Sequence, residues 1–131
     1  MSSKRKGRDF ELFVYNDLKI ELPDIKLSKW SGVGADEPGD LMTSKILFEC
    51  KRFRHASDNL IQEWMNKDAI READQLDKIP VVIYRLDRQK PKCIFRFKDL
   101  GLRLDGNCIT DYETGKVIIN RLDGNSILPL K

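Results

Sequence analysis

Three side chains that can support phosphate chemistry, Asp40, Glu49 and Lys51, lie close together in the sequence. Apolar pairs of residues flank a polar turn at Thr43–Lys45 between the two acids, and this pattern predicts a β-hairpin. The hairpin sets Asp40 across from Phe48 or Glu49, with opposed Cβ atoms about 4.5–5.5 Å apart. Two carboxylates at this spacing can hold a hard divalent cation such as Mg²⁺ through oxygen. Such a cation polarises a phosphate and lowers the pKa of a bound water.

Alternation along the second strand of this hairpin separates its side chains into two sets. Ile46, Phe48 and Cys50 share one face and can enter a core, whereas Glu49 and Lys51 share the other face. A solvated edge strand with alternating charge would show the same Glu-x-Lys pattern, so the motif alone is weak. Glu49 nevertheless ends a mostly apolar strand, and acids in such places are usually paired or bound to metal. Pro38-Gly39 also favours a tight entry into the hairpin.

The composition indicates one soluble globular domain. The chain has 131 residues, of which 40% are hydrophobic and 34% are charged, and it contains no apolar run near the roughly 20 residues that a membrane span needs. The basic N-terminal residues are not followed by the apolar segment of a secretory signal. Three scattered cysteines and the single His55 offer no zinc-binding spacing, so we expect reduced thiols and a cytoplasmic protein, or a virus-encoded one that acts in the host cytoplasm.

The net charge of +3 is modest, but its distribution is uneven. Acidic residues dominate from Asp68 to Asp77, whereas basic residues cluster on either side of the acidic pair. These basic residues are Lys4, Arg5, Lys6 and Arg8 near the N-terminus and Lys51, Arg52 and Arg54 after Glu49. Basic clusters around a candidate phosphodiester site favour a polyanionic substrate. The alternative is a basic tail that only aids solubility.

Periodicity predicts the elements that must position these residues. Residues 1–6 are expected to form a flexible basic arm. A helix from Gly7 to about Ile20 would bury Phe10, Phe13, Val14 and Leu18 on one face. Glu11 lies at the edge of that stripe, where it either complements the positive helix N-terminus or leans over the hairpin to complete a metal site.

The remaining elements follow from similar patterns. We expect a short strand within Asp24–Trp30, a loop over Ser31–Gly39, and a long helix capped by Ser57 or Asp58 that runs to about Lys78. The apolar stripe of that helix, predicted to pack on the core, comprises Ile61, Trp64, Met65, Ala69, Ala73 and Leu76. Later segments predict a buried strand at Ile79–Leu86, a turn, a strand at Cys93–Phe97, and a terminal hairpin pairing Ile109–Tyr112 with Lys116–Asn120. The fold class is therefore α/β, with a central mixed sheet flanked by helices, a core over residues 6–98 and a C-terminal β extension over 99–131.

This order of elements and residues resembles the PD-(D/E)xK nuclease superfamily, and within it the archaeal-type Holliday-junction resolvases and related small phage nucleases. The matching motifs are Lys6-Gly7-Arg8, Phe10-Glu11, Trp30-Ser31-Gly32, Pro38-Gly39-Asp40 and Glu49-Cys50-Lys51. Such a chain would have a restriction-endonuclease-like core and act as a homodimer, because symmetric cutting of a four-way junction takes two sites. The dimer contact would involve the terminal hairpin, Trp64 or the sheet edge.

The resemblance also implies roles for individual residues. Asp40 and Glu49 would bind Mg²⁺ or Mn²⁺, with a backbone carbonyl from Cys50 and with Glu11 assisting directly or through water. Lys51 would orient the attacking water. Candidate DNA contacts are Lys6, Arg8, Ser31, Arg52 and Arg54.

The sequence supports several functions. The first is a metal-dependent endonuclease that hydrolyses DNA phosphodiesters, acting on branched DNA as a resolvase. A restriction-type or repair nuclease would use the same chemistry on another substrate. A non-catalytic DNA-binding protein with a degenerate site, or a purely structural protein, are the alternatives of another class. The complete set Glu11, Asp40, Glu49 and Lys51 argues against a degenerate site, and a purely structural protein would leave Glu49 on its apolar strand unexplained.

Overall fold

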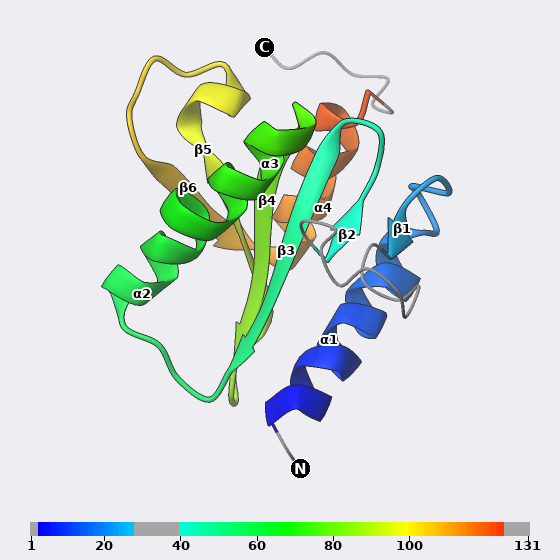
Figure 1. Cartoon of the computed structure of the whole chain (residues 1–131), viewed down its shortest axis with the longest axis vertical. Helices are drawn as coiled ribbons and strands as arrows, with labels where there is room; N and C mark the ends of the chain where they lie inside the picture. The colour runs from blue at the N-terminus through cyan, green and yellow to red at the C-terminus, as the bar shows by residue number, and fades with distance from the viewer. Residues whose placement is uncertain (1–2, 28–39, 125–131) are drawn as a thin grey trace.

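The computed structural model describes residues 3–27 and 40–124, which form a six-stranded mixed sheet with helices on both faces (Figure 1). The strands lie in chain order, β1 to β6, across the sheet. Their bounds are β1 Lys26–Leu27, β2 Leu41–Met42, β3 Ile46–Phe53, β4 Ile79–Leu86, β5 Lys92–Arg96 and β6 Asn107–Asp111. The helical elements are α1 Ser3–Leu18, α2 Asp58–Glu63, the π-helix η1 Trp64–Ala69, α3 Ile70–Leu76, the 3₁₀ helix η2 Phe97–Leu100 and α4 Tyr112–Leu122. The predicted mixed sheet flanked by helices is confirmed.

The sheet is antiparallel except between β3 and β4, its two longest strands. These strands run parallel from the Ile46–Ile79 pair to the Phe53–Leu86 pair. A parallel pair needs a crossover, and α2, η1 and α3 provide it across one face of the sheet. The predicted central strand at Ile79–Leu86 is confirmed, and it lies between β3 and β5.

The predicted hairpin is formed by β2 and β3. Leu41 pairs with Phe48 and Met42 with Leu47, and the backbone N–H of Thr43 donates to the carbonyl of Ile46 at 2.9 Å. A residue beyond the hairpin also binds its turn, because Lys78 Nζ donates to the carbonyl oxygen of Thr43 at 2.5 Å. The register of the strand that carries Glu49 and Lys51 is therefore set at its beginning.

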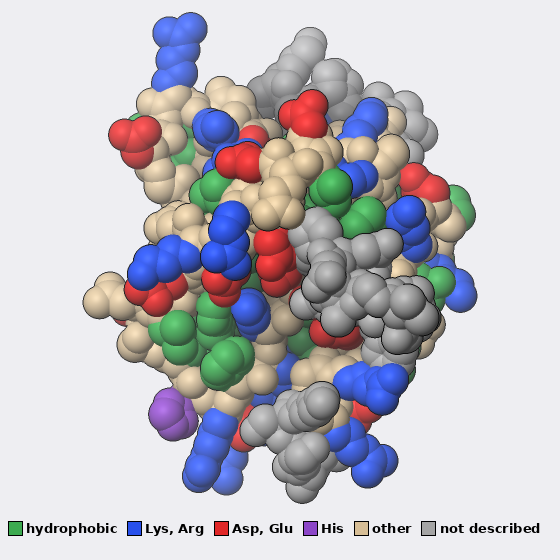
Figure 2. Space-filling model, viewed as in Figure 1, with side chains coloured by type: hydrophobic (Ala, Val, Ile, Leu, Met, Phe, Trp, Pro, Cys, Tyr) green, Lys and Arg blue, Asp and Glu red, His purple; other side chains and the backbone are tan. Residues whose placement is uncertain are grey.

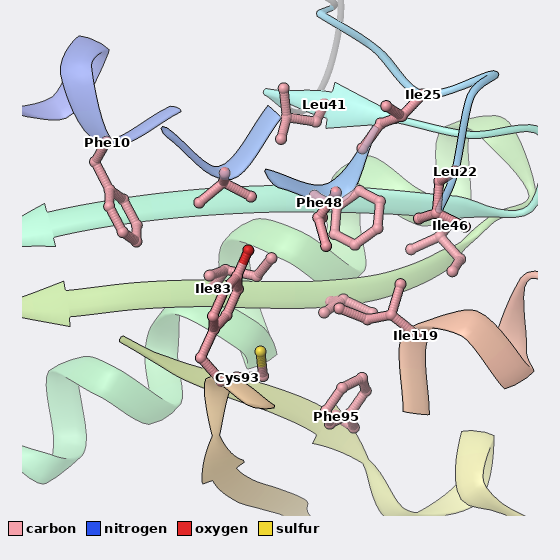
Figure 3. Packing of buried hydrophobic residues seen from close by; sticks show 14 residues of the cluster. Phe10, Leu22, Ile25, Leu41, Ile46, Phe48, Ile83, Cys93, Phe95 and Ile119 are labelled. Atoms are coloured by element: carbon pink, nitrogen blue, oxygen red, sulfur yellow. The ribbon is translucent and has the colours of Figure 1, made fainter. Parts of the chain in front are cut away.

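Each face of the sheet has its own apolar cluster. The larger one lies between the sheet and helices α1 and α4, and it includes Phe10, Phe48, Ile83, Phe95 and Ile119 (Figure 3). The smaller one lies under the crossover and includes Trp64, Met65, Val82, Tyr84 and Ile94. Trp64 is only 2% exposed and stacks on Phe53 and Tyr84, so this side chain is part of the core and offers no dimer contact.

Helix α1 differs from the prediction at its start and on its apolar face. It begins at Ser3, so residues 3–6 are helical and do not form a flexible arm. Phe10, Val14 and Leu18 are buried as predicted, but Phe13 is 51% exposed and leans on Tyr112 at a ring separation of 6.2 Å. The sheet therefore buries a narrower face of α1 than the spacing of its apolar residues predicted.

The crossover begins as predicted, at an N-cap where Ser57 Oγ accepts from the backbone N–H of Leu60. It then passes through the π-helix η1 and ends at Asp77, which has a left-handed φ of 53°. The predicted stripe is buried from Ile61 to Ala73, whereas Leu76, the last residue of α3, is 39% exposed.

The predicted C-terminal hairpin is wrong, and so is the predicted β extension that contained it. Only its first strand exists, as β6, and the second is helix α4, capped by Asp111. Gly115, interpreted as a turn glycine, lies in this helix against β5, where an added Cβ would stand 2.4 Å from Cys93 Sγ. The residue is therefore glycine because the helix approaches the sheet closely. Tyr112, Gly115 and Ile119 are buried at helical spacing, so this segment belongs to the core beyond residue 98.

Two further observations concern the described residues. Cys50, Cys93 and Cys108 are free thiols. Across residues 3–27 and 40–124, no helix combines the length and the hydropathy that crossing a membrane requires.

Candidate metal-binding and DNA-binding site

Asp40 lies where β2 begins, and its side chain continues the hydrogen-bond ladder of the hairpin. Its backbone N–H donates to the carbonyl of Phe48 at 3.0 Å, and its Oδ2 accepts the N–H of Cys50 at 2.7 Å. The carboxylate thus occupies the place where a longer β2 would have presented a carbonyl. It is 4% exposed and fixed against β3 by both bonds. Of the two predicted positions for Asp40, across from Phe48 or from Glu49, the backbone hydrogen bond places it at Phe48.

Glu49 is buried on the adjacent strand, also 4% exposed. Asp40 binds the residues on either side of Glu49, because its N–H donates to the Phe48 carbonyl and its Oδ2 accepts the Cys50 N–H. On the other side, Glu49 pairs with Val82 of β4, whose side chain lies under the crossover helices. Its Oε2 is fully buried and accepts no hydrogen bond from the described residues, although the carboxylate as a whole does interact with its neighbours.

Cys50 supplies backbone groups between the two acids. In an antiparallel pair, the N–H and C=O of a hydrogen-bonded residue point to the same neighbour, so the Cys50 carbonyl faces the same edge as its N–H, toward Asp40. Burial raises the pKa of the Cys50 thiol well above its ordinary value, and the charges of Asp40, Glu11 and Glu49 raise it further. The thiol therefore stays protonated, and three carboxylates act on one point of the strand.

Lys51 lies on the same face of β3 as Glu49 and is ion-paired with Asp68 at 3.2 Å. Asp68 comes from η1, and its side chain is 36% exposed, whereas that of Lys51 is 22% exposed. Sequence analysis missed Asp68 because it lies within an acidic stretch of a helix. Only the wider turn of the π-helix, a form often found at functional sites, and the register of β3 bring the two together.

Glu11 reaches this region from the opposite face. It is half-buried on α1, which packs on the face of β3 that carries Phe48 and Cys50, whereas Glu49 lies on the other face. Within the described residues, no three His, Cys, Asp or Glu side chains gather closely enough to hold a metal. Direct ligation by all three carboxylates is thus not built into this arrangement, and the metal role of Glu11 stays a prediction.

The donor set fits a hard cation nonetheless. Mg²⁺ is commonly bound through one or two carboxylates and keeps several waters, so it needs no complete protein cage. Asp40, Glu49 and the Cys50 carbonyl are oxygen donors at one point of the sheet, and no sulfur or imidazole ligand is required. These three groups are the ones that would hold the ion.

The predicted DNA contacts are distributed unevenly. Lys6 and Arg52 meet at Asp87, which their nitrogens approach to 2.8 and 2.6 Å. Arg8 and Arg54 are exposed, and Ser31 lies outside the described residues, as does the whole predicted loop. On the face that carries the crossover helices, basic and acidic side chains are interspersed (Figure 2). Basic charge thus does not form one continuous patch on that face.

Comparisons with known proteins give one kind of match. No protein-family model matches the chain, and no curated protein matches its sequence. Among solved structures, a Holliday junction resolvase from the archaeal hyperthermophile Archaeoglobus fulgidus matches with 15% sequence identity and a TM-score of 0.47, over 94% of this chain and 99% of that chain. It is a protein of the kind that the sequence resemblance named.

Proposed function

We propose that the protein is a metal-dependent endonuclease that hydrolyses DNA phosphodiester bonds. The observation that carries the proposal is that Asp40 and Glu49 are both buried and that Asp40 binds the residues on either side of Glu49, the Phe48 carbonyl at 3.0 Å and the Cys50 N–H at 2.7 Å. Burying two like charges side by side is costly unless a cation or a reaction uses them. Lys51, two residues along the same strand, supplies the positive group that phosphate chemistry needs.

Each residue has a distinct task in this proposal. Asp40 and Glu49, with the Cys50 carbonyl, would hold Mg²⁺ or Mn²⁺, and the bound ion would supply Lewis acidity and a water of lowered pKa. Lys51 orients the attacking water, and its ion pair with Asp68 keeps the long side chain in one position. Glu11 adds negative charge from the other face of β3. The basic residues at the end of β3 hold the phosphate backbone.

The finer part of the proposal is the substrate. The motifs shared with resolvases favour branched DNA, with a four-way junction as the substrate and a homodimer as the active form, because two symmetric cuts need two sites. The C-terminal hairpin and Trp64 are removed as candidate dimer contacts by helix α4 and by the burial of Trp64. The sheet edge stays a candidate.

The test uses labelled four-way, flapped, duplex and single-stranded DNA with Mg²⁺ or Mn²⁺. Wild-type protein should cut, and Asp40→Asn should not, whereas Asp24→Asn, which changes an exposed carboxylate, should cut like wild type. Paired symmetric nicks in the junction would support the resolvase, and equal cutting of all substrates would leave a nuclease of another kind.

A second measurement does not depend on cleavage. Titration calorimetry with Mn²⁺ should show binding to wild type and to Asp24→Asn, and a loss of about tenfold or more in Asp40→Asn, the scale seen when groups that support a metal are removed. DNA binding without cleavage under either metal, together with unchanged Mn²⁺ affinity in Asp40→Asn, would sink the nuclease proposal in favour of a non-catalytic DNA-binding protein.

A further inference from the structure

The turn between β4 and β5, residues 87–91, meets the start of α1 and the end of β3 at the lower end of the molecule (Figure 1). Asp87 opens this turn and binds two cations from different elements. Its Oδ1 lies 2.8 Å from Lys6 Nζ of α1 and 2.6 Å from Arg52 Nη1 of β3. Three segments that are distant in sequence are thus joined by one carboxylate.

The turn itself is built by specific hydrogen bonds. The N–H of Asp87 donates to the carbonyl of Arg54 at 3.2 Å, and Arg85 Nε donates to the carbonyl of Gln89 at 3.0 Å. Arg88 has a left-handed φ of 64°, which non-glycine residues rarely adopt. The turn therefore has a defined shape, and it presents an exposed arginine at its tip.

Several positively charged side chains lie close together at this end of the molecule and repel one another. Arg52 and Arg85 are directly paired across β3 and β4, and like charges at opposed positions destabilise a sheet. Arg54, Arg85, Arg88 and Lys90 are all exposed around Asp87. Hydrogen bonds from Lys6 and then from Arg52 lower the pKa of Asp87, which keeps this carboxylate ionised at neutral pH. Positive charge still exceeds negative charge among these residues.

We propose that Asp87 and the β4–β5 turn form a preorganised surface for the phosphate backbone of DNA, in which Asp87 positions Lys6 and Arg52 while Arg88 and Lys90 bind phosphates directly. The surface rests on the proposed function and deepens it, because Arg52 lies on the same face of β3 as Cys50, whose N–H binds Asp40, whereas Glu49 and Lys51 lie on the other face. Two residues of strand, about 6.6 Å, separate Arg52 from Cys50. A DNA strand that passes Asp87 and Arg52 would thus also reach the place where Asp40 binds Cys50.

Preorganisation predicts a change in DNA affinity that is opposite to the change expected from net charge alone. Simple electrostatics predicts that removing any carboxylate strengthens binding to DNA, because the net charge rises by one. If Asp87 positions Lys6 and Arg52, its removal weakens binding instead, since both long side chains must then be ordered by the DNA. The two accounts therefore predict opposite changes for one substitution.

The experiment measures DNA affinity by fluorescence anisotropy in EDTA, so that cleavage plays no part. Asp87→Asn is compared with Asp105→Asn, which makes the same charge change at an exposed position in the loop before β6. We expect Asp105→Asn to bind as well as or slightly better than wild type and Asp87→Asn to bind about three- to tenfold more weakly. A melting curve for each variant would verify that it stays folded, which matters most for Asp87→Asn because Asp87 and its two partners are partly buried.

The second pair of variants tests the direct contacts. Arg88→Ala and Lys90→Ala should each weaken binding and reduce the slope of log affinity against log salt by about one. Lys98→Ala removes an exposed lysine at the opposite end of β5 and should leave that slope unchanged.

The outcomes separate this proposal from the nuclease proposal. The proposed surface would be overturned if Asp87→Asn binds DNA as tightly as Asp105→Asn. It would also be overturned if Arg88→Ala and Lys90→Ala show the same salt slope as Lys98→Ala. Either result would count against the surface even if the protein cuts DNA. Weakened binding in Asp87→Asn from a protein that never cuts DNA would support the surface and reject the nuclease.

Discussion

Phe48 and Glu49 are neighbours on β3, and both are buried, but they face opposite sides of the sheet. Phe48 enters the cluster beneath α1 and α4, whereas Glu49 faces the crossover of α2, η1 and α3. On the first face, the cluster residues of α1 and α4 bring mainly apolar side chains. On the second face, η1 brings Trp64 and Met65 and then Asp68, whose carboxylate pairs with Lys51.

The difference shows how one strand can serve folding and chemistry together. Successive side chains of a strand point to opposite faces, so β3 can carry core residues on one face and site residues on the other. The apolar face stabilises the strand, and that stability allows a carboxylate to stay buried on the opposite face beside another one. Substitution of Phe48 should therefore affect mainly folding, and substitution of Glu49 should affect mainly activity.

The largest effect on stability is expected from Phe48→Ala. Phe48 is fully buried in the larger cluster, and removing its ring should lower the free energy of unfolding by about 3–5 kcal/mol. Urea denaturation followed by circular dichroism would measure the change. A loss under about 1 kcal/mol would show that this face does not carry the stability of the strand, since even Ile→Val changes in cores usually cost that much.

An intermediate effect is expected from alkaline titration of Cys93, which lies on the same face. Burial raises the pKa of Cys93 from 9.0 to about 12, so the native state keeps a proton that the unfolded chain loses above pH 9. The stability that this thiol confers is complete below pH 9 and is lost as the pH rises toward 12, at up to about 1.4 kcal/mol per pH unit.

The control for this titration is Cys93→Ala, measured at the same pH values. The difference in unfolding free energy between wild type and variant should shrink as the pH rises from 9 to 11. A constant difference would mean that this face tolerates an ionised group, and the contrast between the two faces would be lost.

The smallest effect on stability is expected from Glu49→Gln, although its effect on cleavage should be complete. The amide keeps the shape of the side chain and removes a buried charge beside Asp40, so the free energy of unfolding should equal or exceed that of wild type. Denaturation and cleavage assays on one preparation would test both statements. Destabilisation comparable to that of Phe48→Ala would show that Glu49 has a structural role.

Local patterns were sufficient to predict the hairpin, the central strand and the grouping of Asp40 with Glu49. The alternation of β3 and the polar turn at Thr43–Lys45 are properties of adjacent residues, and the register follows from the length of the turn. The same reasoning failed for α4, because Gly115 does not form a turn. It is glycine because the helix approaches Cys93 too closely for a side chain. Tyr112, Gly115 and Ile119 carry the helical spacing that would have corrected it.

Hydrophobic periodicity also predicted wider buried faces for the helices than the structure shows. It assigned Phe13 and Leu76 to buried stripes, yet both are exposed because burial at the edge of a stripe depends on what lies beside the helix. The ion pairs of Lys51 with Asp68 and of Lys6 with Asp87 could not be predicted either. Nothing in a single sequence relates residues 17 or 81 positions apart until strands and helices are placed.

The sequence by itself determined the types of the candidate site residues, their alternation along β3 and the hairpin that brings Asp40 to Phe48 and Cys50, because these depend on contacts within a few residues. Only the tertiary structure decided which charges meet. The parallel pairing of β3 with β4 placed η1 over Lys51 and set the β4–β5 turn beside the start of α1. Long-range contacts of this kind are set by the packing of complete elements, and local patterns do not encode them.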